Sequence, residues 1–249
     1  MLMLFILAIL KKDNSIVDIG YGIGFIVIAL VTFLAQDITP SHRSILISLY
    51  VVIWGTRLAY RIARKNLGKP EDFRYAAWRA EWQKKGEGYF VIRSFVQIFL
   101  LQGIIILMVA LPIILGNTMQ VDTLKWYNYV GIFLWLFGFL FEAIGDAQLD
   151  KFLKRKRNKT EKSNIMKTGL WKYTRHPNYF GESIQWWGLA LLCLFGVKYS
   201  LVAFVSPILI TYLLLFVSGI PLLEKRWEGD PEWQEYKKKT NAFIPGPQK

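Results

Sequence analysis

Long apolar stretches separated by short polar segments dominate the hydrophobicity pattern of this chain. Six stretches are long and apolar enough to cross about 30 Å of hydrocarbon, which takes about 20 helical residues. They are Ile16 to Ala35, Ser44 to Ala63, Ser94 to Leu115, Trp126 to Gly145, Tyr179 to Val197 and Ser200 to Leu222. The opening stretch, Met1 to Leu10, is too short for a full span and lacks the cleavage site of a signal peptide. The pattern predicts an all-α fold in one domain over residues 1–249, a polytopic transmembrane bundle of six full spans plus a short N-terminal helix.

The positions of the basic residues test this assignment, because Lys and Arg collect in the cytoplasmic loops of membrane proteins. Most of the 31 basic residues lie in four segments. These segments are Lys11–Lys12, Arg64 to Arg93, Lys151 to Arg175 and the tail from Lys225. They alternate with segments that are almost free of basic residues, as an even number of spans requires. The charges therefore predict that the basic loops and the C-terminus are cytoplasmic, in a cell inner membrane or an endoplasmic-reticulum-type membrane.

Composition narrows the class of protein further. The chain has 53% hydrophobic side chains, 16% aromatics and a positive mean hydropathy, which excludes an ordinary soluble domain and a disordered chain. A formal charge of +13 on so apolar a chain favours membrane lipids, not nucleic acid, as the anionic partner. The single cysteine, Cys193, excludes an intramolecular disulfide. No pattern in the sequence predicts a bound metal.

Several ionisable residues lie inside the predicted spans, where charge is costly and usually functional. Asp18 precedes the glycine-rich segment GYGIG, whose small residues favour close helix contact. Arg57 and Tyr60 are three residues apart, and Glu142 and Asp146 are four apart, so each pair shares one helix face. Snorkelling to the interface, or a buried structural pair, is the alternative for these groups. Two carboxylates on one face need cations or hydrogen-bond donors, which side chains or a bound cofactor could supply.

The segment Gly169 to Gly188, GLWKYTRHPNYFGESIQWWG, carries the most information. Pro177 is well placed in the first turn of a helix, where its missing N–H costs nothing. The unpaired amides of that turn, flanked by Arg175, His176 and Asn178, predict a site for an anionic or amide-bearing ligand. Glu182 follows Asn178 by four residues and shares its face. A purely structural role for His176 remains the alternative.

These motifs resemble the DUF1295 family of steroid 5-alpha-reductase-like membrane proteins, and the resemblance covers nearly the whole chain. RHPNYFGE at Arg175 to Glu182, with GLW before it and WWG after it, carries the resemblance most clearly. The other matching segments are SIVDIGYG, WGTRLAYRIARKN, EDFRY, FEAIGDAQLDKF, SGIPLLEKR and FIP. The RHPxYxG element alone is shared with isoprenylcysteine carboxyl methyltransferases and related membrane methyltransferases.

The resemblance implies a seven-helix steroid-reductase-like architecture and an NADPH-dependent reductase. Its substrate would be a lipophilic enone, steroid-like or isoprenoid, whose conjugated carbon–carbon double bond accepts hydride at the β carbon. Tyr60 looks like the tyrosine that faces the substrate carbonyl, and Asp18 like its acidic partner. The residues that match the nucleotide-binding pattern are Glu142, Asp146, Arg175, His176, Asn178, Tyr179 and Glu182, the last also a catalytic candidate. The chain differs from the animal steroid reductases in having Glu142 where they have Asn.

Two other functions remain open. An S-adenosylmethionine-dependent methyltransferase would bind its cofactor beside His176 and Pro177, with Glu224 and Arg226 as the acid and the cation in the tail. Those enzymes typically have paired glutamates in that region, whereas Lys225 follows Glu224 here. A non-catalytic membrane scaffold or lipid-binding protein would bind no soluble nucleotide.

Overall fold

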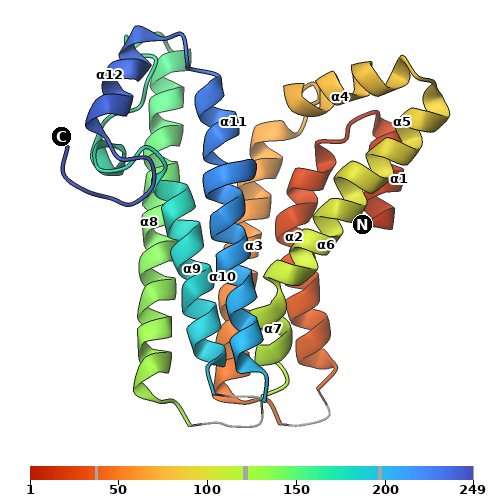
Figure 1. Ribbon diagram of the computed structural model, residues 1–249, viewed down its shortest axis with the longest axis vertical. Helices are drawn as coiled ribbons and strands as arrows, with labels where there is room; N and C mark the ends of the chain where they lie inside the picture. Colours follow the sequence, from red (N-terminus) through yellow and green to blue (C-terminus); the bar gives the residue numbers. More distant parts are fainter. Residues whose placement is uncertain (37–38, 120–122, 196–197, 249) are drawn as a thin grey trace. The chain divides into compact units, whose positions relative to one another are not determined.

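The computed structural model contains helices and no strands in the residues that it describes, 1–36, 39–119, 123–195 and 198–248 (Figure 1). The predicted all-α fold is confirmed. The main helices are α1 (Leu2–Lys11), α2 (Ile16–Leu34), α3 (His42–Asn66), α4 (Phe73–Gln83), α5 (Glu87–Arg93), α6 (Leu101–Val109), α7 (Leu111–Gly116), α8 (Trp126–Arg157), α9 (Pro177–Cys193), α10 (Val205–Tyr212), α11 (Ile220–Lys225) and α12 (Pro231–Lys239). Short 3₁₀ or π segments are η1 (Ser94–Leu100), η2 (Gly169–Lys172), η3 (Ser200–Phe204) and η4 (Leu213–Val217).

Five helical stretches in the described residues are long and apolar enough to cross a membrane. They are Ile16–Leu34, His42–Asn66, Glu87–Val109, Trp126–Arg157 and Ser200–Lys225. The other predicted span, Tyr179 to Val197, corresponds to α9, which has 17 residues and a length of about 25 Å at 1.5 Å per residue. Its predicted last residues, 196 and 197, lie outside the described residues. The stretches indicate an integral membrane protein, while the count of six spans stays a prediction.

The chain divides into two compact units. Unit 1 comprises Met1–Thr123 with Gly196–Lys198, and unit 2 comprises Leu124–Phe195 with Tyr199–Lys249. Unit 1 therefore contains α1 to α7, and unit 2 contains α8 to α12. That residues 1–249 form one integral membrane domain stays a prediction.

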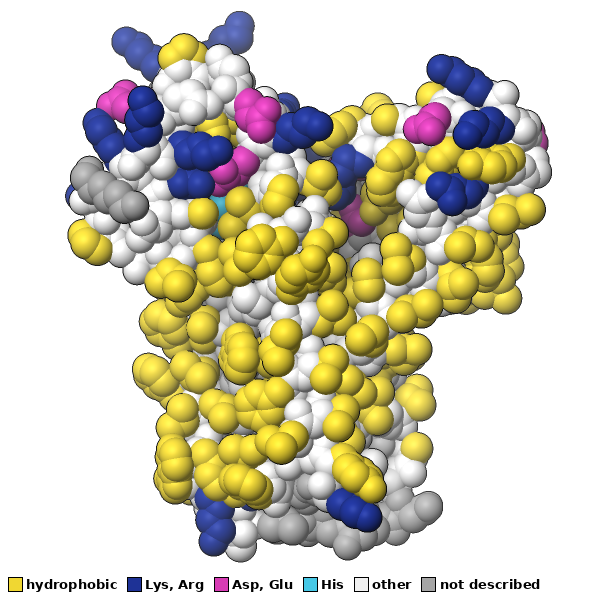
Figure 2. Space-filling view, viewed as in Figure 1, with side chains coloured by type: hydrophobic (Ala, Val, Ile, Leu, Met, Phe, Trp, Pro, Cys, Tyr) yellow, Lys and Arg dark blue, Asp and Glu magenta, His cyan; other side chains and the backbone are white. Residues whose placement is uncertain are grey.

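Apolar side chains cover the long helices of both units (Figure 2). Exposed large hydrophobic residues recur along α2, α6, α8 and α10. Lys and Arg gather over α12 in unit 2 and over the region of α4 and α5 in unit 1 (Figure 2). Apolar helix surfaces with basic residues beyond their ends are the distribution expected of helices exposed to lipid.

Close approach of α2 and α3 organises unit 1. A Cβ atom at Gly22 would lie 2.7 Å from the Gly55 carbonyl oxygen, and one at Gly55 would lie 2.9 Å from the Gly22 carbonyl oxygen. Neither glycine can therefore carry a side chain without separating the two helices. The small residues of GYGIG thus do what the sequence predicts.

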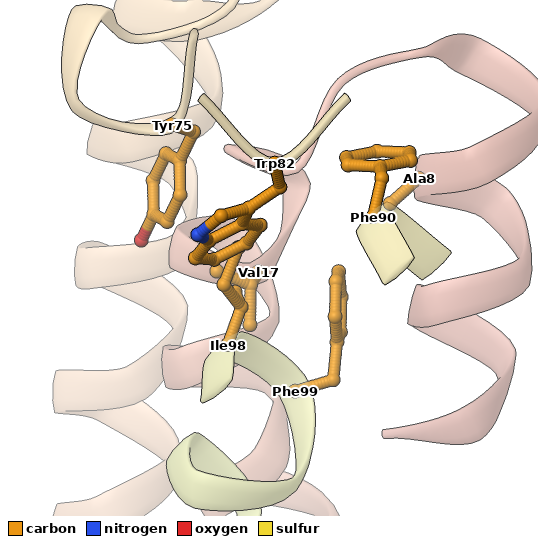
Figure 3. Close-up of a cluster of buried hydrophobic side chains, with 7 residues drawn as sticks. All are labelled: Ala8, Val17, Tyr75, Trp82, Phe90, Ile98 and Phe99. Atoms are coloured by element: carbon orange, nitrogen blue, oxygen red, sulfur yellow. The ribbon is translucent and has the colours of Figure 1, made fainter. Parts of the chain in front are cut away.

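Residues of α4, α5 and η1 pack against α1 and α2 in unit 1, around one buried cluster. This cluster contains Ala8, Val17, Tyr75, Trp82, Phe90, Ile98 and Phe99 (Figure 3). The carboxylate of Glu71 accepts hydrogen bonds from the Arg79 side chain at 2.8 and 2.9 Å and from the Asn14 backbone N–H at 2.6 Å. The segment before α5, expected only to be cytoplasmic, is therefore a docked helix that shares a buried cluster with α1 and α2.

In unit 2, α8 and α9 form a close helix pair whose backbones are in contact. Gly131, Gly138 and Gly145 recur at intervals of seven residues along α8, and Gly181 and Gly188 do so along α9. A Cβ atom at Gly138 would lie 2.5 Å from the Gly181 carbonyl oxygen, and one at Gly131 would lie 2.7 Å from that of Gly188. A seven-residue repeat keeps one face of each helix turned toward the other along its length.

The charged run KFLKRKRNK spans Lys151 to Lys159, and its first seven residues continue α8 beyond the apolar part of the helix. Helix α8 ends at Arg157, and Lys154 to Arg157 form its last turn. Cations at a helix C-terminus interact favourably with the partial negative charge of the exposed carbonyls. The run is thus held on the same helix that contains Glu142 and Asp146.

The α8–α9 contact predicts that Gly138→Ala destabilises the protein strongly for so small a change. The added methyl group would meet backbone atoms of Gly181 and Gln185, which can move only if the helices separate. We expect a loss of about 1–3 kcal/mol and a fall in the thermal midpoint of about 2–4 °C per kcal/mol. Tryptophan fluorescence during heating in detergent measures this midpoint.

Gly88→Ala is the matched control, because a Cβ atom at Gly88 in α5 would meet no atom within 4 Å. Alanine is the better helix former, so this variant should be as stable as the wild type or slightly more stable. Equal midpoints for the two alanine variants would contradict the proposed role of the α8–α9 contact.

Candidate functional site

The C-terminal segment of unit 2 is hydrogen-bonded to the residues just before α9. The Arg175 backbone N–H donates to the Asn241 carbonyl oxygen at 2.9 Å. The Thr174 hydroxyl donates to the Phe243 carbonyl oxygen at 2.8 Å. The RHP motif is therefore held between α9 and residues 241–246.

A buried ion-pair cluster anchors the same motif. Arg175 donates from Nε to Glu224 Oε1 at 2.8 Å and from Nη2 to Glu224 Oε2 at 3.2 Å. Its Nη1 donates to the carbonyl oxygens of Thr240, at 2.5 Å, and of Lys237, at 3.2 Å. The Arg175 and Glu224 side chains are 7% and 9% exposed, so the charges are compensated by each other and not by water.

His176 joins this cluster and is the N-cap residue of α9. Its Nε2 lies 3.0 Å from Glu224 Oε1, and its ring stacks on Tyr179 at 5.6 Å. Burial, opposed by Glu224, lowers the pKa of His176 below its usual value, so the imidazole is neutral at pH 7. Pro177 occupies the first turn of α9, as the sequence predicts.

The hydrogen-bond partners of Arg175 and His176 named above are thus residues of unit 2. The guanidinium binds one carboxylate and two backbone carbonyls, which orients it toward the C-terminal segment. In the described structure these two residues position the start of α9. Their direct contact with a cofactor stays a prediction.

Polar side chains also meet at the contact between α8 and α9, further along α9 from the RHP motif. Gln185 Nε2 donates to Glu142 Oε2 at 2.7 Å, and both side chains are buried. Asp146 is also buried, and the adjacent Gly145 packs against Pro177 and Asn178. The predicted nucleotide-binding residues of α8 therefore lie beside those of α9.

This polar cluster is rich in hydrogen-bond acceptors. The Oδ1 atom of Asn178 and the Oε1 atom of Gln185 are buried and have no hydrogen-bond partner among the described residues. Buried acceptors left without donors cost free energy, and a ligand with amide or hydroxyl donors would relieve that cost. In the same described ranges, no group of three or more His, Cys, Asp or Glu side chains is placed to hold a metal ion.

In unit 1, Asp18 accepts hydrogen bonds from two residues of the EDFRY motif. The Tyr75 hydroxyl donates to its carboxylate at 2.6 Å and Arg74 Nη2 donates at 3.1 Å. Burial, and next the Asp18 carboxylate, raise the pKa of Tyr75, so its hydroxyl keeps its proton over the physiological pH range. Asp18 thus connects α2 to α4.

Tyr60 lies on α3 of unit 1 and is 65% exposed. This degree of exposure fits a tyrosine that faces lipid or substrate, and it also fits an ordinary tyrosine of the membrane interface. Its role at a substrate carbonyl, and the role of Asp18 as its acidic partner, stay predictions. Glu182, on α9 of unit 2, is half-buried, and its role stays a prediction too.

Sequence reasoning did not single out Gln185 or Tyr75. Gln185 follows Asn178 by seven residues and Glu182 by three, so the three share one helix face, and this spacing could have identified it. Tyr75 pairs with Asp18 across 57 positions of sequence, and no local pattern reveals such a contact. Glu224 was considered only as a cofactor-binding acid, whereas it is the counter-ion of Arg175.

The fold and these residues define a polytopic helical membrane protein with a polar site at the start of α9. Residues 4–240 match the sequence profile of DUF1295, described as a protein of unknown function. The chain belongs to the DUF1295 family. It is similar to an uncharacterized protein of Schizosaccharomyces pombe, with 23% identity over 261 aligned positions that cover 95% of this chain and 70% of the relative. No solved structure matches the chain significantly.

The Arg175–Glu224 pair predicts that Glu224→Gln is strongly destabilising. The amide keeps the shape of the side chain but leaves the buried guanidinium without a counter-charge, which costs about 3–5 kcal/mol when one partner of a buried pair is removed. Thermal unfolding in detergent measures the loss.

Glu235→Gln makes the same chemical change in an exposed pair. Glu235 and Lys239 are 67% and 54% exposed, and water and salt screen such a pair, so its loss should change stability little. Similar, small effects of the two substitutions would show that the buried cluster does not hold the RHP motif in place.

Proposed function

We propose that this protein is a membrane-embedded reductase that uses NADPH to reduce a carbon–carbon double bond conjugated to a carbonyl group in a lipophilic substrate. The observation that carries the proposal is the acceptor-rich polar cluster at the α8–α9 contact of unit 2. Glu142, Asp146, Asn178 and Gln185 are the residues that would hold the donor groups of the cofactor. The resemblance to steroid 5-alpha-reductase-like proteins supplies the reaction class.

The acceptors of this cluster match the donors of a dinucleotide. A nicotinamide carboxamide offers N–H groups, and riboses offer hydroxyls. The buried Oδ1 of Asn178 and Oε1 of Gln185 have no partner among the described residues, which fits such donors. Because both acceptor atoms are buried, each hydrogen bond gained there is worth more than one at an exposed site.

The cations on α8 favour a cofactor that carries phosphates. Asp146 and Lys154 are eight residues apart on one helix, or about 12 Å along its axis. Lys151, Lys154 and Arg157 are exposed and are available to phosphate oxygens. In this arrangement the carboxylates of α8 would face the riboses of the cofactor, and the cations of α8 would face its phosphates. That order of charges matches NADPH better than a cofactor without phosphates.

When bound, NADPH supplies the hydride that adds to the β carbon of the substrate. The residues of the chain must bind the cofactor, exclude water and provide a proton donor for the carbonyl oxygen. We assign the last role to Tyr60 on the resemblance alone. A phenol hydroxyl can donate a hydrogen bond to the substrate oxygen as negative charge develops there.

S-adenosylmethionine is the alternative cofactor, since its amino and hydroxyl groups are also donors. Glu224, the acid proposed for that chemistry, already binds Arg175 and lies beside His176. Arg226 is exposed and its guanidinium stacks on Trp227 at 5.6 Å. These contacts favour the reductase over the methyltransferase.

The first test measures cofactor binding by the purified protein in detergent, with NADPH, NADH and S-adenosylmethionine in separate titrations. We expect NADPH to bind best, and Asn178→Ala to weaken it about tenfold, the effect of one net hydrogen bond. Asn158→Ala, at an exposed position after α8, is the matched control and should bind NADPH normally. Stabilisation by S-adenosylmethionine alone would establish the methyltransferase alternative, and no binding of any nucleotide would favour a scaffold.

The second test concerns Tyr60→Phe, assayed with any lipophilic enone that the protein reduces. Loss of the hydroxyl removes the proton donor, so we expect turnover to fall about 10²-fold or more with little change in NADPH affinity. Tyr129→Phe, which alters another exposed tyrosine, should leave turnover unchanged. Turnover of Tyr60→Phe within about twofold of wild type would mean that another group holds the carbonyl, since a general acid contributes about 10²-fold or more.

A further inference from the structure

Unit 1 contains a pocket at the start of α2 and the end of α3, two of the helices that are long and apolar enough to cross a membrane. Its volume is about 470 Å³, within the range of about 300–1,000 Å³ that ligand pockets occupy. The end of α1, the first turn of α2 and the connection between α3 and α4 form its walls. Since α2 starts at Ile16 and α3 ends at Asn66, the pocket lies at one membrane boundary.

Three lysines line this pocket, and they come from two separate parts of the chain. Lys11 and Lys12 end α1, and Lys69 lies in the connection after α3. Lys11 and Lys12 are exposed, and no carboxylate of the described residues pairs with either. Lys69 donates one hydrogen bond to the Lys65 carbonyl oxygen, which leaves its charge uncompensated.

The two acids in the pocket wall are already occupied by their own neighbours. Glu71 is neutralised by Arg79, whose Nε lies 2.8 Å from Oε2. Asp13 accepts hydrogen bonds at Oδ1 from the backbone N–H of Ser15, at 2.9 Å, and from its hydroxyl, at 2.5 Å. The pocket therefore presents an excess of positive charge to a ligand.

Three aliphatic residues form part of the remaining wall, beside the polar Ser15 and Asn66. Ile16 and Ile19 contribute from α2, and Leu67, which is 64% exposed, contributes from the α3–α4 connection. A soluble phosphate has no apolar part that could cover these side chains. An amphiphile does, because its phosphate can meet the lysines while its glycerol and first acyl carbons cover the isoleucines.

We propose that this pocket binds the headgroup of an anionic phospholipid. The phosphate lies between the lysines of α1 and Lys69, and the acyl chains leave along α2 into the bilayer. Basic pockets between membrane helices on the cytoplasmic side are the sites at which such headgroups bind. The proposal does not depend on the reductase activity, because every residue that it uses belongs to unit 1.

The experiment titrates the delipidated, full-length protein in mixed detergent micelles with phosphatidylglycerol or phosphatidylcholine, and measures bound lipid by native mass spectrometry. Inorganic phosphate and glycerol 3-phosphate are the soluble arms. We expect selective binding of phosphatidylglycerol, and Lys11→Gln/Lys12→Gln should weaken it about tenfold or more. Lys69→Gln, on the opposite wall, should weaken it severalfold.

Lys84→Gln/Lys85→Gln is the matched control. It removes two exposed charges from the same unit, outside the pocket, and should leave lipid binding within twofold of wild type. Equal weakening by both double variants would overturn the proposal in favour of diffuse surface charge. No effect of Lys69→Gln, or equal binding of inorganic phosphate and phosphatidylglycerol, would also overturn it. Circular dichroism of each variant identifies a loss that comes from misfolding.

Discussion

Backbone contact between α8 and α9 is the constraint on which the rest of unit 2 depends. Two helices in lipid gain little from the hydrophobic effect, since acyl chains are as apolar as leucine. Their association relies on close packing and interhelical hydrogen bonds. Glycines at three successive heptad positions of α8 supply the packing. Asn128 Nδ2 donates to the Leu191 carbonyl oxygen at 3.2 Å, and Trp171 Nε1 donates to that of Gly145 at 3.0 Å.

The same contact explains why polar side chains lie inside an apolar helix pair. Glu142 lies between Gly138 and Gly145 on the face of α8 that meets α9, so its carboxylate cannot reach lipid or bulk water. Gln185 supplies one donor to it. Aliphatic residues occupy other buried positions further along α9, as Leu189 and Leu192 illustrate. The Glu142–Gln185 hydrogen bond therefore joins the two helices and also places polar groups inside their contact.

Hydropathy predicted the helical fold and the short N-terminal helix, and the position of Pro177 predicted the start of α9, because local sequence determines each of these features. Hydropathy and charge missed α4 as a docked helix, since Tyr75 and Trp82 are too widely spaced among polar residues to appear as a span. They also placed the basic run after Lys151 in a loop, although it continues α8 to Arg157. The pairing of Arg175 with Glu224 joins residues 49 positions apart. Only tertiary structure brings such groups together, so no spacing rule predicted it.

The structure also gives a physical reason why the RHP motif identifies a scaffold better than a reaction. Arg175 binds Glu224 and the carbonyls that precede the C-terminal segment, a neutral His176 completes the cluster, and Pro177 starts the helix. All three act on the position of α9. The polar groups with unused acceptors, Asn178 and Gln185, follow the motif. Enzymes with different cofactors can therefore share RHP while differing in the next two turns of the helix. Under the proposed function, the side chains of those turns and the cations at the end of α8 are the groups that would select a phosphate-bearing cofactor over S-adenosylmethionine.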